Sequence, residues 1–490
     1  MAHNKFLPRV LAAAAAMMLL AGCGSKADPG FSPANPVNIT IWTYYNGEQL
    51  EAFNALVDEF NSTVGKEQGI TVESSSHGSV TDLENNVLAS AEGKVGAEAM
   101  PNIFSAYADT AYALDEMGQI ADLSDYLSEE DRAAFIEDYL SEGDFSGSGS
   151  IKIFPVAKSA ELHECFVSEG CEIYGMVNHS IISTGTGATY DDLATIEGLV
   201  SVAERYYEWT DAQTPDIPND GRAFFGRDAM ANYMLIGAKQ LDCTIFDAQD
   251  GSMTLNFDHD AVRTLWDNYY VPFIKGYFSA SGRFRSDDVK TGNIIAYVGS
   301  SSSATFFPTQ VIADDMDSHD ITRKALESPK FANGEDYAVQ QGAGMVVTKA
   351  SDAEIQASLV FLKWFTSPEH NITFSVDSGY LPVTHEGNSI DAIRISGLAL
   401  SDEMDEVLSA AVDTVNENHL YTPRAFSGGT NARAILEYSM SDKASADRAA
   451  VKEAMAQGQS FEDASAQFLS DECFEAWYQD TLASLEAFQG

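Results

Sequence analysis

The chain has 490 residues, 45% of them hydrophobic, and 74 acidic against 28 basic side chains give a formal net charge of −46. This length exceeds what one compact core fills and predicts two lobes, and the acidic balance argues against nucleic acid as a partner. No phosphate-binding loop, nucleophile elbow or diagnostic carboxylate pair is present, so we expect neither enzymatic activity nor a cofactor.

The N-terminus has the organisation of a bacterial lipoprotein signal. Basic residues precede an apolar run over 10–20, and Leu20-Ala21-Gly22-Cys23 forms a small-residue cleavage site. We expect residues 1–22 to be removed and Cys23 to be lipidated, which would anchor the protein to the extracytoplasmic face of the cell membrane. The alternative is a plain signal peptide with an incidental cysteine. Residues 23–36, polar and proline-rich, predict a flexible tether, and no later apolar stretch reaches the roughly 18 residues that span a bilayer.

Three strands, over 37–41, 70–72 and 101–105, alternate with helical patterns in the first part of the chain. This β-α-β-α-β series predicts an α/β lobe with a mostly parallel sheet. Ligands of such sheets bind beyond the carboxyl ends of the strands. The candidate binding residues at the three strand ends are Trp42, Tyr44, Tyr45, Ser76, Tyr107 and Asp109.

The aromatic cluster of Trp42, Tyr44 and Tyr45 favours carbohydrate, because aromatic faces pack against sugar rings while polar tips reach the hydroxyls. Ser76 and Asp109 are candidates to hydrogen-bond those hydroxyls. The competing interpretation is core packing. Consecutive positions of an extended segment face both ways, so we expect at least one of the three rings to be buried.

Basic residues are rare in so acidic a chain, and Lys158, Arg227 and Arg424 are therefore further candidates. If they converge in a cleft they would favour phosphate or carboxylate; the alternative for each is an ion pair with one of the many acids. Phe225 is a candidate stacking residue, although its setting also suits a buried position. Cys165 and Cys171 could form a disulfide, and their spacing to His163 and His179 matches no strong zinc pattern, so we expect no metal.

The stretch from Tyr337 to Thr384 begins with a β-branched run around Gly342 and Gly344, where a backbone bend or hinge would fit. Ser351 and Glu354 have the spacing of a capping box at the start of an amphipathic helix, and Ser367-Pro368 restarts it. The chain then leaves through Gly379 and an extended Leu-Pro-Val.

Together, Gly342 to Thr348, Phe361-Leu362-Lys363-Trp364-Phe365-Thr366-Ser367-Pro368-Glu369 and Ser378-Gly379-Tyr380-Leu381-Pro382-Val383 resemble the extracellular solute-binding proteins of bacterial ABC importers, in the group of maltose- and glycerol-phosphate-binding proteins. The resemblance implies a two-lobed periplasmic-binding-protein fold with a ligand cleft between the lobes and Gly342, Gly344 and Gly379 at the hinge. It implies a first lobe of residues 37–150 plus 343–381 and a second of 151–342 plus 382–490. The strand ending before Ser300 and Ser301 would present ligand contacts from the second lobe.

The resemblance also implies a function: capture of a small solute, which we expect to be a sugar or oligosaccharide, followed by delivery to permease and ATPase subunits. Alternatives are a phosphorylated or acidic solute such as glycerol phosphate, an extracellular glycan-degrading enzyme, and the sensor subunit of a receptor. Residues 162–188 depart from the family pattern, which expects an apolar strand ending near an asparagine. A diverged insertion or an altered reading frame would explain this, and the strand after Lys158 is therefore in doubt.

Overall fold

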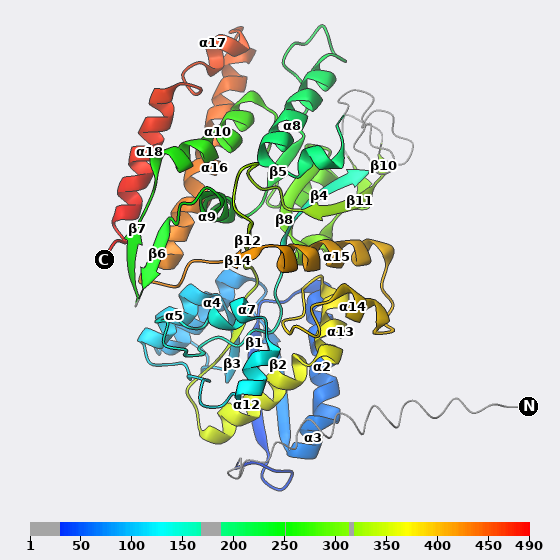
Figure 1. The fold of residues 1–490 in the computed structure, drawn as a ribbon, viewed down its shortest axis with the longest axis vertical. Coiled ribbons are helices and arrows are strands. Elements are labelled where there is room, and N and C mark those ends of the chain that lie inside the picture. The colour runs from blue at the N-terminus through cyan, green and yellow to red at the C-terminus, as the bar shows by residue number, and fades with distance from the viewer. Residues whose placement is uncertain (1–29, 168–187, 250, 313–317) are drawn as a thin grey trace, which may run out of the picture.

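The computed structural model describes residues 30–167, 188–249, 251–312 and 318–490. Its helices and strands form two lobes, one above the other in Figure 1, and the mixed α/β class confirms the prediction from the sequence. The signal peptide and Cys23 lie outside the described residues. Within the part that the structure describes, no helix is long and apolar enough to cross a membrane.

The first lobe is built on a four-stranded sheet in the order β13-β3-β1-β2. Its strands are β1 (Val37–Thr43), β2 (Ile70–Ser76), β3 (Ile103–Ala106) and β13 (Gly344–Val347). β1, β2 and β3 run parallel, as predicted, and β13 joins β3 in the antiparallel direction. The carboxyl ends of the three parallel strands therefore meet at one edge of the sheet.

Helices cover both faces of this sheet, and an apolar cluster lies on each face. The helices of the first lobe are α2 (Gly47–Ser62), α3 (Val64–Gln68), α4 (Val80–Ala91), α5 (Ala108–Glu116), α6 (Glu129–Ala134), α7 (Glu137–Ser141), α12 (Asp352–Phe365), α13 (Pro368–Ser378) and α14 (Ile390–Ile395).

The helical pair α12 and α13 forms where the local signals place it. The Ser351 side chain accepts from the Glu354 amide, and the Glu354 carboxylate accepts from the Ser351 amide at 3.0 Å, which confirms the capping box. Pro368 occupies the first turn of α13, and Gly379 ends it in the left-handed conformation with φ of 71°. These capping residues set both ends of the pair without help from distant parts of the chain.

The second lobe has its own four-stranded sheet, in the order β11-β4-β8-β5. Its strands are β4 (Glu161–Val167), β5 (Phe225–Arg227), β8 (Ala296–Ser300) and β11 (Thr322–Glu327). β4 lies inside the sheet and pairs in the antiparallel direction with both neighbours. The doubt about a strand after Lys158 was therefore wrong, although residues 168–187 of the anomalous segment lie outside the described part.

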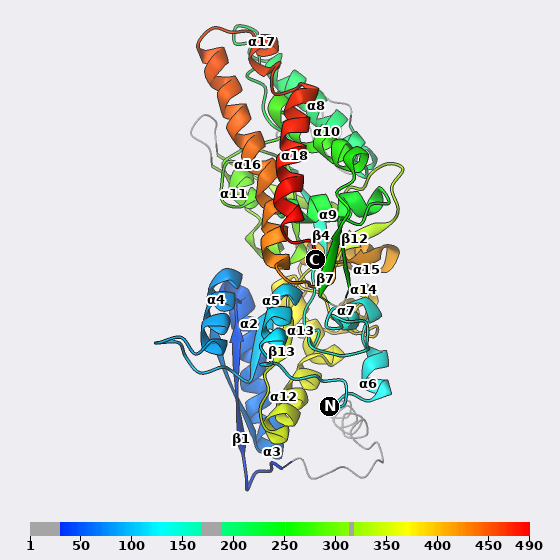
Figure 2. The same cartoon turned by 90° about the vertical axis from the view of Figure 1, so that its left-hand side faces the viewer.

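Helices surround the second sheet, and Figure 2 shows the two longest C-terminal ones, α16 and α18, side by side along the lobe. The remaining elements of this lobe are η1 (Tyr190–Leu193), α8 (Ile196–Asp211), α9 (Met230–Gln240), β6 (Phe246–Gln249), β7 (Ser252–Leu255), α10 (His259–Lys275), α11 (Arg285–Lys290), η2 (Ser301–Phe306), β9 (Gln310–Val311), β10 (His319–Asp320), α16 (Gly429–Ala456), α17 (Phe461–Ser465) and α18 (Asp471–Glu486).

Three segments cross between the lobes next to one another, joined by the bridges Phe154 to Met345, Lys158 to Leu381 and Ser159 to Gln341. A fourth passage, β14 (His419–Tyr421), pairs with β12 (Tyr337–Val339), which begins the segment that contains Gln341 and Met345. The lobes are thus connected by hydrogen-bonded strands and not by a single linker.

Helix α15 (Asp402–Glu417) lies between the lobes in Figure 1. It packs on β11 and η2 of the second lobe, yet its buried side chains belong to an apolar cluster of the first. The expected boundary after residue 381 falls within a segment that still pairs with the first lobe, because the Ile136 amide donates to Val383 O and the His385 amide donates to Ala134 O.

Candidate functional site

A cavity of about 500 Å³, hereafter the interlobe cavity, is lined by both lobes and by the crossing segments. From the first lobe come residues at the carboxyl end of β3 and on α4, and from the second lobe come the first turns of α9 and α16. Its lining residues are Val80, Glu84, Tyr107, Ala108, Asp109, Glu142, Ala229, Asn232, Leu235, Phe246, Val339, Gln340, Gln341, Thr422, Pro423, Arg424, Phe426, Gly429, Thr430, Arg433 and Glu437.

Asp109 is the main polar group of the first-lobe wall. It lies in the first turn of α5, where a carboxylate interacts favourably with the helix dipole. Burial raises its pKa to about 6; the cation of Arg433 acts in the opposite direction. Burial likewise raises the pKa of Glu84, whose Oε1 accepts from the Thr110 hydroxyl at 2.8 Å. The cavity therefore holds two carboxylates that burial penalises when they are charged.

Helix α16 supplies the opposite wall. Gly429, Arg433 and Glu437 are spaced four apart, so they share one face of the helix, and all three line the cavity. A Cβ added at Gly429 would overlap the Asp109 carboxylate. This glycine therefore allows a side chain of the first lobe to approach the first turn of a second-lobe helix.

Arg433 is held by a chain of buried polar groups. Its Nη2 donates to the Asn232 Oδ1, and the Asn232 Nδ2 donates to Glu161 Oε1 at 2.8 Å. The other oxygen of Glu161 accepts from Arg227 Nη2 at 2.9 Å. Such a fully paired chain fixes the orientation of Arg433 toward the cavity.

Three residues that the sequence singled out, Tyr107, Asp109 and Arg424, meet in the interlobe cavity. Tyr107 is the residue before α5, and burial raises the pKa of its hydroxyl well above the usual value. Arg424 is exposed in the segment before α16. The structure thus brings together candidates that lie more than 300 positions apart in the sequence.

The aromatic candidates at the end of β1 do not line this cavity. Trp42 is 6% exposed and its ring lies 4.4 Å from that of His77. Tyr45 is 2% exposed, within an aromatic group that includes Phe53 and Phe374. Core packing, the competing interpretation, therefore describes these two rings.

Tyr44 and Ser76 lie beside that core. The Tyr44 hydroxyl is 3.3 Å from the Tyr380 hydroxyl, and the Ser76 hydroxyl donates to the Tyr45 carbonyl at 2.5 Å. Their polar groups are thus engaged within the first lobe and are not among those lining the cavity.

Two of the three cations have structural partners. Lys158 is fully buried and is paired with Glu142, and its Nζ also donates to Gly342 O at 2.7 Å. It therefore ties the first and second crossing segments together. Arg227 is 7% exposed and paired with Glu161, as described above. Only Arg424 of this set lines the interlobe cavity.

The candidate residues of the second lobe, Phe225, Ser300 and Ser301, pack against or hydrogen-bond to other parts of the protein. Phe225 is 3% exposed and packs against Phe278. Ser300 is the N-cap of η2 and accepts from the Ser302 amide at 3.3 Å. The Ser301 hydroxyl donates to Gly379 O at 3.0 Å, so this serine joins the second lobe to a crossing segment.

The predicted hinge glycines lie on the crossings. Gly342 has φ of 100°, and a Cβ there would come within 3.0 Å of Ala157 O. Gly379 is left-handed and faces Ser301 O, and Gly344 starts β13 against Ile153. Close backbone approach therefore accounts for a glycine at each position; their role in a hinge motion stays a prediction.

The sequence analysis missed Glu84, Asn232, Arg433 and Glu437. A signal for the last two was present: a helix starting after the break at residues 421–429 places 429, 433 and 437 on one face. Glu84 and Asn232 had no such signal, because one carboxylate among 74 acidic residues and one amide within an apolar helix do not stand out.

Cys165 is buried and free, and its thiol contacts Lys324 O at 3.7 Å. Cys171 and His179 lie outside the described residues. Among those that the structure describes, no group of three or more His, Cys, Asp or Glu side chains is arranged to hold a metal ion.

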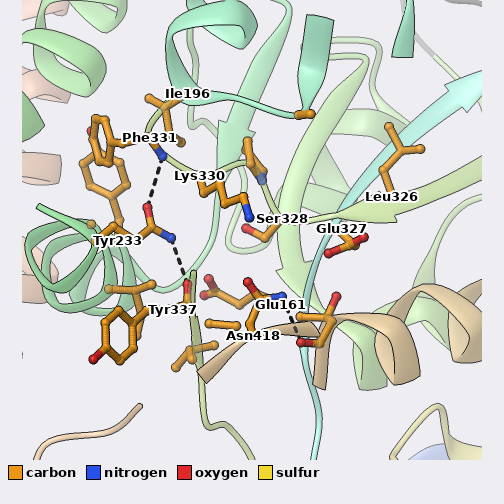
Figure 3. Close-up of a pocket in the computed structure, with 18 of the residues that line it drawn as sticks. Glu161, Ile196, Tyr233, Leu326, Glu327, Ser328, Lys330, Phe331, Tyr337 and Asn418 are labelled. Atoms are coloured by element: carbon orange, nitrogen blue, oxygen red, sulfur yellow. Dashed lines mark hydrogen bonds between the residues drawn. The ribbon is translucent and has the colours of Figure 1, made fainter. Parts of the chain in front are cut away.

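A second cavity, hereafter the hinge cavity, lies within the second lobe against β12 and α15, with a volume of about 340 Å³ (Figure 3). Gln240 bridges its wall, since its amide donates to Tyr337 O at 2.9 Å and its oxygen accepts from the Phe331 amide at 3.1 Å. Glu327 faces it, and burial followed by the charge of Glu417 raises the pKa of Glu327. Because its lining lacks the strand ends of the first lobe, it does not meet the geometry of a site closed by both lobes.

The sequence matches the family described as bacterial extracellular solute-binding protein over residues 55–393. No curated protein matches it as a relative.

Similar solved structures include the cyclic alpha-maltosyl-1,6-maltose binding protein of Arthrobacter globiformis, at 15% identity and a TM-score of 0.64, covering 92% of this chain and 100% of that one. UgpB of Mycobacterium tuberculosis in complex with glycerophosphocholine has 15% identity, a TM-score of 0.62 and coverage of 92% and 98%. An ABC substrate-binding protein of Listeria monocytogenes in complex with cycloalternan has 14% identity, a TM-score of 0.62 and coverage of 92% and 99%. At these identities the likeness shows the two-lobed fold.

Proposed function

Because the chain belongs to the family of bacterial extracellular solute-binding proteins, we propose that its interlobe cavity captures a sugar or oligosaccharide and that the closed protein delivers it to the permease and ATPase subunits of an ABC importer. The protein acts as a binding protein and not as an enzyme. Lipidation of Cys23 holds it at the extracytoplasmic face of the membrane, and residues 23–36 serve as the tether.

The main support for this proposal is that residues of both lobes line the interlobe cavity. Tyr107 and Asp109 come from the first lobe, and Asn232 and Arg433 come from the second. A solute that touches both walls gains these contacts together only when the lobes are close, so it shifts the equilibrium toward the closed form. Gly342, Gly344 and Gly379 are the proposed hinge positions.

The chemistry of the lining favours a neutral solute. Four carboxylates and two guanidinium groups line the cavity, so an anion would meet more like charge than opposite charge. Carboxylates and amides can accept and donate hydrogen bonds to sugar hydroxyls, and the rings of Tyr107 and Phe246 offer faces for a sugar ring. We therefore place the sugar among Tyr107, Asp109, Asn232 and Arg433.

A second candidate is a phosphorylated or acidic solute such as glycerol phosphate. Arg424 and Arg433 both line the cavity, and a guanidinium matches the oxygens of a phosphate. Because the fold is also similar to that of a protein in complex with glycerophosphocholine, solutes that contain phosphate are included in the experiment below.

The two candidates are separated by measuring thermal stabilisation and calorimetric affinity for maltotriose, a cyclic glucan, glycerol phosphate and glycerophosphocholine at low and high salt. A neutral glycan should raise the melting temperature, its affinity should change little with salt, and Asp109→Ala should weaken it at least tenfold. Ser75→Ala, an exposed position of β2 that does not line the cavity, is the control. Stabilisation by glycerol phosphate alone, lost in Arg433→Ala, would establish the second candidate instead.

A further inference from the structure

A third cavity, hereafter the distal cavity, lies at the end of the second lobe away from the interlobe cavity and has a volume of about 540 Å³. It is formed by the last turns of α8 and α10, the loop before β5 and the later part of α16. Figure 2 shows α16 running from the level of the first lobe up along the second. Lys452 is 23 positions beyond Gly429 on this helix, so the two cavities are separated by roughly 35 Å.

The charge of the distal cavity is the reverse of that of the other two. The interlobe cavity and the hinge cavity are each lined by four carboxylates and two cations. Among the residues that the structure describes, those lining the distal cavity include three cations, Arg222, Arg448 and Lys452, and one carboxylate, Asp220. In a chain with 74 acidic and 28 basic residues, this local excess of positive charge opposes the field of the whole molecule.

Arg448 and Lys452 are one turn apart on α16, and like charges at this spacing repel. Among the described residues, neither is paired with a carboxylate; the polar partners of Arg448 are the Tyr207 hydroxyl and the Ile274 carbonyl. The desolvation of Lys452, followed by the charge of Arg448, lowers the pKa of the Lys452 ammonium. Two cations are therefore kept together beside a cavity without an acid to compensate them.

Arg448 is fixed in place by the backbone of α10. Its Nη1 donates to Ile274 O at 2.8 Å, and its guanidinium lies where a Cβ at Gly276 would be. The Lys452 ammonium is only partly desolvated, because the residue as a whole remains exposed. Hydroxyl and amide groups of Ser279, Ser281 and Asn293 complete the lining opposite the cations.

We propose that the distal cavity is a second binding site, separate from the sugar site, for the phosphate or sulfate group of a small organic anion. Arg448 and Lys452 contact the oxyanion, and Arg222 contributes from the facing loop. The anion removes the repulsion between the two helix cations and replaces water on a preformed set of donors. A cavity of this size holds a sugar phosphate as readily as the headgroup of a phospholipid, and the shared chemistry is the phosphate.

The test uses the full chain with Cys23→Ser, so that no lipid anchor binds the vesicles, and two matched pairs. Glucose 6-phosphate is compared with glucose by calorimetry, and Lys452→Gln is compared with Lys443→Gln, a lysine of the same helix paired with Asp447 at 2.8 Å. We expect glucose 6-phosphate, and not glucose, to bind outside the sugar site, Lys452→Gln to weaken it about tenfold, and Lys443→Gln to leave it unchanged. Binding that persists in Asp109→Ala and Arg433→Ala separates the distal site from the interlobe cavity.

Vesicles containing phosphatidylglycerol form the second arm. Co-sedimentation with them that is lost in Lys452→Gln, without binding of the free sugar phosphate, assigns the phosphate to a lipid headgroup. The proposal is overturned if neither probe binds, if binding is equal in wild type and Lys452→Gln, or if it disappears with Arg433→Ala.

Discussion

The carboxylate of Asp109 is charged at neutral pH in a place where charge is costly. Its pKa in the folded protein is about 6, above the value of about 3.9 for an unfolded chain. Between these values the folded state retains a proton that the unfolded state has lost, so the stability from this residue is present below pH 4 and falls as the pH rises toward 6.

Asp109→Asn removes the group whose charging is costly. We therefore expect the unfolding free energy of the ligand-free variant to exceed that of wild type by about 1 to 2 kcal/mol more at pH 7 than at pH 4. Urea unfolding of both proteins at pH 4, 5 and 7 measures this. Identical pH profiles of the two proteins would contradict a raised pKa at Asp109.

A variant of Lys158 tests whether this basic residue, identified from the sequence, contacts the ligand or stabilises the folded protein. Its buried ammonium is satisfied by Glu142 and by Gly342 O, so Lys158→Met leaves a buried carboxylate without its cation. We expect a loss of about 3 to 5 kcal/mol in unfolding free energy.

Glu142→Gln in the Lys158→Met background should recover part of that loss, because it removes the unpaired charge. Chemical denaturation of the two single variants and the double variant gives the comparison. A Lys158→Met protein of unchanged stability that no longer binds solute would place Lys158 in the site after all.

At the scale of elements, the start of α16 fits against the first lobe only because Gly429 has no side chain. Gly429→Ala should be harmless to the helix itself, since alanine is a good helix former. Its Cβ would nevertheless overlap Asp109, so we expect weaker solute binding, by about tenfold, with little change in thermal stability. Calorimetry on this variant and on Asn431→Ala, an exposed position of the same turn that does not line the cavity, isolates the effect.

The double variant Gly429→Ala with Asp109→Gly removes the overlapping group. At a saturating concentration of solute the double variant should close, whereas Gly429→Ala alone should stay open, and small-angle scattering with and without solute reports the closure. The solute must be saturating because Asp109→Gly also removes a proposed sugar contact. Equal affinity of wild type and Gly429→Ala would show that this contact does not limit closure.

The elements that could be predicted from sequence are those with local signals. The capping box at Ser351, Pro368 and Gly379 defines α12 and α13, and apolar alternation defines β1. β4 was doubted because its polar residues, such as His163 and Glu164, look unlike a central strand. Both are fully buried; Glu164 is satisfied by Arg323 and by the Tyr297 hydroxyl. Partners 133 and 159 positions away leave no trace in a local pattern.

The candidate site, like β4, could be predicted from local sequence patterns only in part. The strand-end rule found Tyr107 and Asp109, but it also selected Trp42 and Tyr45, since the sequence does not reveal which face of β1 is covered. It could not find Asn232, whose importance comes from Glu161 and Arg433. Convergence of residues from distant elements follows from the tertiary fold, and each residue alone looks ordinary.

At the scale of the whole molecule, the anchor and the fold are expected to be independent. The first strand, β1, starts at Val37, beyond the proposed tether. Cys23→Ser should therefore release the protein into the medium of a Gram-positive host without changing its melting temperature. Fractionation and a thermal melt of the released protein measure both results; retention of the variant in the membrane would contradict lipidation at Cys23.

Strand β13 completes the sheet of the first lobe but lies far along the chain from the strand with which it pairs. Met345 pairs with Ser105 across 240 positions, so the first lobe keeps an open sheet edge until most of the second lobe has been made. Contacts of such long sequence separation form slowly. A chain emerging from a ribosome therefore cannot complete its first lobe early, because β13 is synthesised 240 positions after the strand with which it pairs.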